Sequence, residues 1–465
     1  MNVDIAFLAF ALVAWLPFRF CRPAVAAAIV FFAGWVFLPV GHYAPGSAQA
    51  TFPFWITGLA VPSDMLLTKA WVAPVAALLG AAAFDSAALR RCRPRWIDLP
   101  MVAWCAWPLV QAMLQSLATD AVASPSAMLA SLYVAGCWGA PWLLGRLYFG
   151  SPEGLRLLAM AMTGSALACL PFSLVEGVAG PMLYNRAYEL HPMREDGIER
   201  YIGFRPLGFF EDGNQFGIWI ALCALAAVWL AVVGRHDRFA KRWRVAAVVV
   251  VAMAVAAQSL GALLMLATGA AFLSLCRFLR PRGTAVALLV VLVLGGTVYV
   301  SGVVPIMRIG RDTEIGREVV EALRSVGRGS FAWRISQDQK LLADARQNMV
   351  IGSATWDWWR PKDTRPWALS MLLLGQFGLV GLTLAMGSLL WPALLVAWRA
   401  PRASGWRPDG VQLMVATVIV LAALDALLNA FFFFPAIVAA GALAGSAVAV
   451  VHAGGEIVVM PESAA

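Results

Sequence analysis

The chain has 465 residues, of which 61% are hydrophobic and only 13% are charged, and its mean hydropathy is +0.76. A soluble domain carries about 25% charged residues, so this composition excludes a soluble fold and indicates that lipid is the main solvent. The net charge of +9 comes mostly from Arg in short loops between apolar runs. The positive-inside rule explains such loops, so no nucleic-acid partner is expected.

Apolar runs of about 17–25 residues follow one another along the chain, and each is long enough to cross a hydrocarbon core of roughly 30 Å as a helix. We predict an all-α transmembrane bundle of thirteen spans, or twelve if the first run does not cross. The predicted spans lie near residues 4–18, 24–41, 69–84, 97–117, 127–145, 155–178, 214–233, 245–258, 261–276, 284–304, 367–397, 411–433 and 436–452. Six clusters of Arg and Lys then fall on one side, which the positive-inside rule makes the cytoplasmic side of a bacterial inner membrane.

Residues 245–276 are too short for two full spans, yet basic clusters flank both of their ends. A single crossing would place one of these clusters outside. We therefore predict a hairpin of two short helices with its tip at Gln258–Gly261.

Two loops face the periplasm in this topology, residues 179–213 and residues 305–366. The longer loop holds eleven basic residues against eight acidic ones. Its stretches Glu314–Val326 and Phe331–Asn348 are predicted to be amphipathic helices. They either lie on the membrane surface or form a lid over a site at the outer face, and the loop's length favours a lid. The expected regions are 1–204 (N-terminal helices with the first loop), 205–304 (central helices), 305–366 (periplasmic loop) and 367–465 (C-terminal helices).

Polar residues gather where the first loop enters a span. Arg205 is followed within nine residues by Glu211, Asp212 and Asn214, among glycines that let a backbone approach a ligand closely. The alternative is an ordinary polar entry with turn glycines. These residues are nevertheless the first candidates for chemistry.

At the end of the longer loop, tryptophans alternate with basic residues as far as Trp367. Tryptophans at this depth commonly form an interfacial belt. Their faces also suit sugar rings, and the planar fork of Arg binds diphosphate oxygens in pairs. Many Arg and only two Lys in this loop favour an anionic ligand with phosphate esters.

Two polar positions lie within predicted spans. Asp425 and Asn429 are four residues apart, so they share a helix face, and they either line a cavity or make a helix–helix hydrogen bond. Glu176 lies near the end of a span and is interpreted as a side chain that reaches the interface.

Several familiar signatures are absent from the sequence. There is no DxD, Walker or GxSxG motif and no CxxC or HxxxH spacing, so no metal or other cofactor is expected. The seven Cys lie in or beside apolar runs, which makes a disulfide framework unexpected.

Four stretches resemble, in order and topology, the O-antigen ligase and O-antigen polymerase-like superfamily of membrane glycosyltransferases, which use undecaprenyl-diphosphate-linked glycans. Residues 205–217 resemble its R-x-x-G-x-F-x-x-x-N entry, and residues 257–264 resemble its T-x-S-R-G stretch. Residues 333–352 resemble R-x-x-x-W…P-x-x-G-x-G in the outer loop. Residues 370–382 resemble H-N-x-x-L-x-x-x-x-E-x-G-x-x-G.

The chain departs from this family pattern at two positions. The family's His falls at Trp367, with no His nearby, and the Arg of S-R-G is Leu260. Ligase-type members rely most on that His, so the departure favours a polymerase of surface polysaccharide. The alternatives are a ligase with a lipid or protein acceptor and a non-enzymatic transporter or flippase of lipid-linked oligosaccharide.

The resemblance implies metal-independent glycosyl transfer at the periplasmic face, with undecaprenyl-diphosphate-linked oligosaccharide and membrane lipid as partners. A chain-length regulator or a flippase is a further candidate partner. Either a carboxylate or the departing diphosphate takes the proton of the attacking hydroxyl. The expected site residues are Glu211 and Asp212 as catalytic carboxylates, Arg205, Arg334, Arg346 and Arg365 as diphosphate ligands, and Asn214 and Trp367 as positioning residues.

Overall fold

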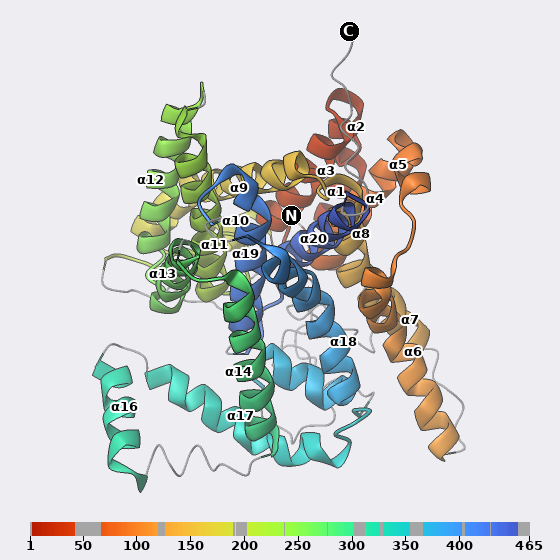
Figure 1. Ribbon diagram of the computed structural model, residues 1–465, viewed down its shortest axis with the longest axis vertical. Coiled ribbons are helices and arrows are strands. Elements are labelled where there is room, and N and C mark those ends of the chain that lie inside the picture. Colours follow the sequence, from red (N-terminus) through yellow and green to blue (C-terminus); the bar gives the residue numbers. More distant parts are fainter. Residues whose placement is uncertain are drawn as a thin grey trace.

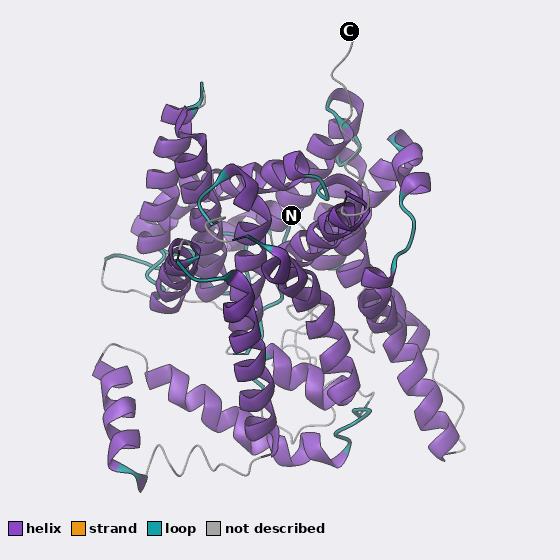
Figure 2. Cartoon of the chain, in the orientation of Figure 1, coloured by secondary structure: helices purple, strands orange, loops and turns teal. Residues whose placement is uncertain are grey.

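The computed structural model describes residues 2–41, 67–119, 126–188, 191, 202–236, 238–276, 278–301, 312–325, 329–353, 366–401, 405–427 and 429–453. The described residues form helices joined by loops and turns (Figure 2). The prediction of an all-α bundle is therefore confirmed.

Each predicted span coincides with a helix or a continuous run of helices. The helices of the N-terminal part are α1 (Val3–Val13), α2 (Leu16–Phe20), α3 (Pro23–Phe37), α4 (Lys69–Phe84), α5 (Ser86–Arg91), α6 (Leu99–Thr119), α7 (Ser126–Val134), α8 (Ala140–Tyr148), α9 (Pro152–Ala179) and α10 (Leu183–Ala187), of which α5 and α10 lie outside the predicted spans. The rest of the chain adds α11 (Gly213–Val233), α12 (Ala240–Ala256), α13 (Leu260–Leu275), α14 (Pro281–Ser301), α16 (Glu314–Ser325), α17 (Gly329–Gln347), α18 (Leu369–Arg399), α19 (Val411–Asp425) and α20 (Phe434–Ala453).

Among the described residues, seven helical stretches are long and apolar enough to cross a membrane, and α3, α4, α13, α14 and α20 are shorter apolar helices. Large apolar side chains stay exposed around the bundle, such as Leu12, Leu117 and Val178. An apolar surface of this extent is unsuited to water and is the surface that lipid covers. The chain is a multi-pass helical membrane protein.

The centre of the bundle is α11, which is buried along most of its length and packs against α9, α12, α13 and α19. The predicted break at the Gln258 turn is confirmed, because α12 ends at Ala256 and α13 begins at Leu260. Gln258 has a φ of 50°, and its side-chain amide exchanges two hydrogen bonds with the backbone of Ile202. The turn is thereby tied to the loop before α11.

One predicted span is too long. The span at 411–433 ends as a helix at Asp425, and residues 431–433 lie outside any helix before α20 begins at Phe434. Asn429 therefore lies beyond the helix, not on its face, although its backbone N–H still donates to the Asp425 carbonyl at 2.8 Å. The four consecutive Phe of this connection pack into the core instead of facing lipid.

The two amphipathic helices predicted in the long loop are α16 and α17, and both lie at one extreme of the molecule (Figure 1, teal). Leu341 and Leu342 of α17 are buried, as the pattern predicts, and Leu342 packs with Ala368 and Met371 beside the start of α18. We use the name "α17 end" for the end of the bundle where α3, α9 and α19 end and α4, α11, α18 and α20 begin.

Candidate functional site

A buried lysine lies at the α17 end. Lys69 opens α4 and is only 1% exposed. Its Nζ donates to the carbonyl of Phe209 at 3.0 Å and lies 4.8 and 4.9 Å from the ring centres of Trp35 and Phe210. It also lies 3.9 Å from Oε1 of Glu211. A buried ammonium is stable only with such partners, and the sequence analysis missed this residue.

Glu211, a predicted catalytic carboxylate, is buried in the loop before α11. Burial raises the pKa of Glu211 to about 7, against the pull of the Lys69 cation. Its backbone N–H donates to Oε1 of Gln215 at 3.1 Å. Oε2 of Glu211 and Nε2 of Gln215 are both buried without a hydrogen-bond partner among the described residues. The carboxylate therefore has an unused acceptor in a dry environment.

Three other predicted residues are joined at the N-terminus of α11. Asp212 is the N-cap, and its Oδ1 accepts from the backbone N–H of Asn214 at 2.6 Å and from the Asn214 side chain at 2.8 Å. Nη2 of Arg205 donates to Oδ1 of Asn214 at 2.8 Å. A Cβ at Gly213 would stand 2.7 Å from the Arg205 side chain, so any larger residue there would displace Arg205. The structure thus brings Arg205, Asp212 and Asn214 together.

Glu176 fixes the shape of this loop. It is fully buried, and its Oε2 accepts from the N–H groups of Leu207 and Gly208 at 2.8 and 2.6 Å, while Oε1 accepts from the N–H of Leu183 at 3.1 Å. The interpretation of Glu176 as a side chain that reaches the interface is therefore wrong. Its carboxylate satisfies backbone amides that the loop leaves without partners.

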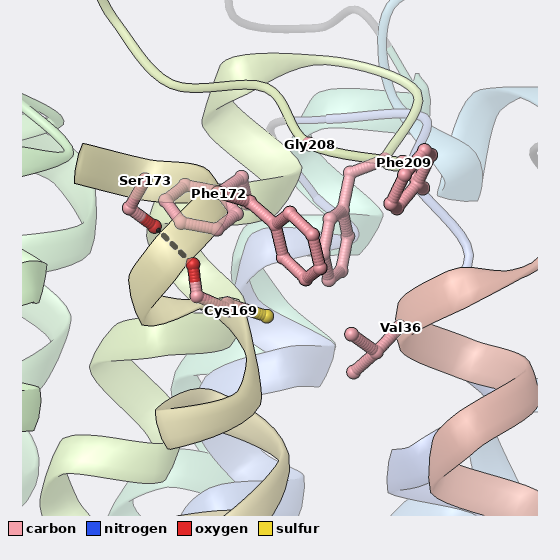
Figure 3. Close-up of a pocket in the computed structure, with 8 residues that line it drawn as sticks. Val36, Cys169, Phe172, Ser173, Gly208 and Phe209 are labelled. Atoms are coloured by element: carbon pink, nitrogen blue, oxygen red, sulfur yellow. Dashed lines mark hydrogen bonds between the residues drawn. The ribbon is translucent and has the colours of Figure 1, made fainter. Parts of the chain in front are cut away.

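A small cavity adjoins this region, between α3, α9 and the loop before α11 (Figure 3). Its lining is mostly aromatic and apolar: Val36, Cys169, Phe172, Ser173, Gly208, Phe209, Phe210 and Phe216. Its volume of about 10 Å³ is room for no more than one water. No sugar fits there, so this cavity is packing space beside the loop.

A second polar cluster joins α17 to the bundle. Nη1 of Arg334 donates to Oδ1 of Asn429, and Nδ2 of Asn429 donates to Oδ1 of Asp425. The Arg334 guanidinium also lies 5.5 Å from the ring centre of Trp367. Asp425 and Asn429 are therefore hydrogen-bonded to each other, which neither sequence interpretation expected. The hydrogen bond to another helix is made by Asn429, and its partner lies on the loop helix α17.

Asp338 belongs to the same cluster, one helical turn after Arg334. It is 5% exposed, and its Oδ1 accepts from the backbone N–H of Trp367 at 2.7 Å. Burial raises the pKa of Asp338 to about 7, although the Trp367 and Ala368 amides and the Arg334 cation each act to lower it. The sequence analysis did not single out this carboxylate.

The helix α18 is broken in the middle, which the sequence analysis did not predict. Gly378 has a φ of 68° and a ψ of −172°, and residues 349–353 lie against the break. The N–H groups of Leu379 and Val380 donate to the carbonyls of Met349 and Val350 at 2.8 and 3.2 Å. The loop segment thus supplies acceptors that the helix would otherwise supply itself.

The carbonyls on the other side of the break also have partners. The N–H of Ser353 donates to the carbonyl of Gly375 at 3.1 Å, and the Gln111 side chain donates to that of Gln376 at 2.6 Å. The indole of Trp107 donates to the carbonyl of Phe377 at 2.9 Å. Since peptide groups in a membrane must be satisfied by protein, α6 and the loop segment are structural parts of this broken helix.

The four stretches that carry the family resemblance pair off in space. The first and second meet where Gly217 packs against Ser259, so closely that a Cβ at Gly217 would stand 2.8 Å from that of Ser259. The third and fourth meet at the α18 break, where Met349 and Val350 accept from Leu379 and Val380. These contacts bring together residues that are 42 and 30 positions apart.

The two polar clusters are joined through an aromatic core. Trp35, whose ring faces Lys69, packs against the rings of Phe433 and Phe434 at 6.0 and 4.6 Å. The segment that carries these two Phe begins at Asn429, which binds Arg334. Both clusters therefore lie at the α17 end.

One predicted diphosphate ligand, Arg346, is not part of this arrangement. Arg346 is exposed and lies twelve residues after Arg334, about 18 Å along α17 at the rise of an α-helix. Arg365 lies outside the described residues. Trp367 lies beside Arg334, as described above. No group of three or more His, Cys, Asp or Glu that could hold a metal ion occurs in the described part of the chain.

The fold and these contacts define a multi-pass helical membrane protein with two buried polar clusters at one end of its bundle. No family model matches the chain, and no curated protein matches it closely enough to count as a relative.

Proposed function

We propose that the protein is a polymerase of surface polysaccharide, a glycosyltransferase that joins undecaprenyl-diphosphate-linked repeat units at the periplasmic face of a bacterial inner membrane. The observation that carries the proposal is the placement of Arg205 and Arg334. They are 129 residues apart in sequence, yet both lie at the α17 end, and each donates to an asparagine amide oxygen, of Asn214 and of Asn429. An amide oxygen accepts from a guanidinium and so orients it.

Two such cations suit a lipid-linked sugar diphosphate. The donor presents a diphosphate at the membrane surface, and its anionic oxygens match the Arg fork. In the transfer, the bond between the sugar C1 and the diphosphate oxygen breaks, and negative charge develops on the leaving diphosphate. Fixed cations that meet this charge lower the barrier, a role that needs no metal. The exposed apolar faces of the bundle give the lipid tail a path beside the site.

The proton of the attacking hydroxyl needs an acceptor. Glu211 and Asp212 are the carboxylates that the sequence analysis assigned to this role, but Glu211 faces the buried Lys69 and Asp212 caps α11. The acceptor is therefore one of these two, another carboxylate at the α17 end or the departing diphosphate.

The test is elongation by purified protein in detergent, given an undecaprenyl-diphosphate-linked repeat unit with chelator present and with the products sized on a gel. The wild type should give a ladder of lengthening lipid-linked glycan. R205A and R334A should each lower kcat by about 10²–10³, the usual cost of a lost charge-stabilising donor. R317A, which removes an exposed arginine of α16, is the matched control and should retain the wild-type rate.

A full ladder from both R205A and R334A, at wild-type protein levels, would show that the scheme is wrong. Intact substrate after incubation with the wild type would direct attention to a ligase without its acceptor or to a transporter. Adding candidate lipid or protein acceptors tests the ligase, and movement of labelled lipid-linked glycan across liposomes tests the transporter.

A further inference from the structure

The cluster around Arg334 contains a carboxylate with the geometry of a general base. Arg334 and Asp338 are four residues apart on α17, so their side chains are neighbours on one face of the helix, with Cβ atoms about 5–6 Å apart. Asp338 is fixed by the 2.7 Å hydrogen bond from the Trp367 N–H, and the Trp367 ring lies 5.5 Å from the Arg334 guanidinium. A cation, a carboxylate and an aromatic face are thus held together.

The spacing matters because of the chemistry of a sugar diphosphate. The anomeric carbon is two bonds from the nearer phosphorus, so a group that attacks this carbon must approach within a few ångströms of the diphosphate. A base for that group must reach its proton at hydrogen-bond distance. A carboxylate one helical turn from a diphosphate-binding arginine has this reach.

All three candidate carboxylates have partners: Asp338 accepts from the Trp367 N–H, whereas Glu211 and Asp212 also face side chains. Oε1 of Glu211 faces the buried Lys69 cation, and the Glu211 side chain is 4% exposed beneath the aromatic core. Oδ1 of Asp212 holds both the backbone and the side chain of Asn214. Asp338 lies instead on a helix of the outer loop, on the surface that faces the end of the bundle.

We infer that Asp338 is the general base of the glycosyl transfer, accepting the proton of the acceptor hydroxyl; the inference rests on the proposed function. In this step the hydroxyl oxygen forms a bond to C1 of the donor sugar, and the bond from C1 to the diphosphate oxygen breaks. The electron pair of that bond leaves with the lipid diphosphate, which Arg334 neutralises. The hydroxyl proton passes to Asp338, which later releases it to water.

Among the described residues, Arg334 on α17 is the charge that acts on Asp338, and Asp425 at the end of α19 lies beyond Arg334 and Asn429. The start of α18, residues 366–378, carries no ionisable side chain and offers backbone amides only. The helix α16, which also packs on α17, carries Glu314, Arg317, Glu318, Glu321 and Arg324.

A pKa of about 7 suits the role, because a base works best when its pKa is close to the operating pH. Above pH 7 the carboxylate is ionised and accepts a proton. Below pH 7 it is already protonated. The elongation rate of the wild type should therefore rise with pH through about 7.

The experiment compares D338N with the wild type between pH 5.5 and 8.5 in the elongation assay. Asparagine keeps an oxygen for the Trp367 N–H but cannot take the proton. We expect kcat to fall by about 10²–10⁴, the rise with pH to disappear and the KM for donor to stay within about threefold. D344N, which removes a carboxylate of the same helix outside this cluster, should retain the wild-type rate and pH profile.

Two further outcomes separate this inference from the proposed function. Full activity in D338N, with the rise through pH 7 intact, would overturn the role of Asp338 and leave the polymerase standing. A wild type that elongates nothing would overturn both. If D338N proves unstable, D338E keeps a carboxylate one methylene further out and should retain a rise with pH at a lower rate. An active D338E enzyme with a flat profile would overturn the inference.

Discussion

Replacing Lys69 by methionine removes a buried cation while nearly keeping its volume, and it tests the reading of Lys69 and Glu211 as an ion pair. The two charges are 3.9 Å apart. At an effective dielectric constant of about 20, this separation corresponds to about 4 kcal/mol of attraction. Removing one partner of a buried pair typically costs about 3–5 kcal/mol, because the other charge is left uncompensated. We therefore expect K69M to lower the free energy of unfolding by about 4 kcal/mol at pH 8.5.

The loss of unfolding free energy in K69M should depend on pH, in a direction set by the titration of Glu211. Its pKa of about 7 lies above the ordinary value of 4.5, so between these two values the folded protein holds a proton that the unfolded chain has released. This group therefore stabilises the fold in acid, and the stability is lost as pH rises through about 7. Without Lys69 the pKa of Glu211 rises further. The K69M penalty should shrink to below about 2 kcal/mol at pH 6, where Glu211 is neutral.

The assay is unfolding in detergent followed by the fluorescence of the 20 Trp residues, with K340M as a control that removes an exposed lysine of α17. K340M should change the free energy of unfolding by less than about 0.5 kcal/mol. At pH 8.5 the double variant K69M/E211Q should lose about 3 kcal/mol less free energy of unfolding than the sum of the losses in K69M and E211Q. Its loss should not depend on pH. A K69M penalty of under 1 kcal/mol at pH 8.5, or one independent of pH, would refute the ion-pair reading.

Two predictions concern the helices that frame the site. G378A should lower the free energy of unfolding by more than about 2 kcal/mol, because the φ of Gly378 is +68° and an added Cβ would overlap the carbonyl of Val350. Thermal unfolding measures this loss. The control G387A, in open space on the same helix, should be neutral or slightly stabilising. D212A should cost about 1 kcal/mol by removing the cap of α11, whereas D212N should stay near the wild type, since asparagine caps as well as aspartate. Equal unfolding midpoints for D212A and D212N would contradict the capping role.

Much of the fold was predictable because few backbone conformations are stable in a lipid bilayer. Backbone groups in a bilayer must be satisfied within the segment, so an apolar run of sufficient length reads directly as a helix. The turn at Gln258 was predictable for a related reason, since the basic clusters on both sides required an even number of crossings between them. The two amphipathic helices of the long loop followed from periodicity, and the burial of Leu341 and Leu342 agrees with it.

The candidate site was less predictable because its contacts join distant segments. Lys69 reads as an ordinary charge at the start of a span, and only the fold places Glu211, 142 residues later, beside it. The partner of Asn429 is Arg334, 95 residues earlier. Within α18, the glycine at Gly378 gave a local signal for a break. The segment that fills the break, residues 349–353, lies earlier in the chain, in the long loop. The sequence analysis therefore predicted one continuous span at 367–397.

The filled break in α18 determines how α17 can move. Residues 349–353 follow α17, and the carbonyls of Met349 and Val350 accept from the amides of Leu379 and Val380. Pulling this segment away would strand both amides within the protein, and each stranded group costs several kcal/mol where no water reaches it. The far part of α17 is held by the side-chain contact of Arg334 with Asn429. The helix is therefore tied to the bundle at two separate places, through the backbone of residues 349–353 and through the side chain of Arg334.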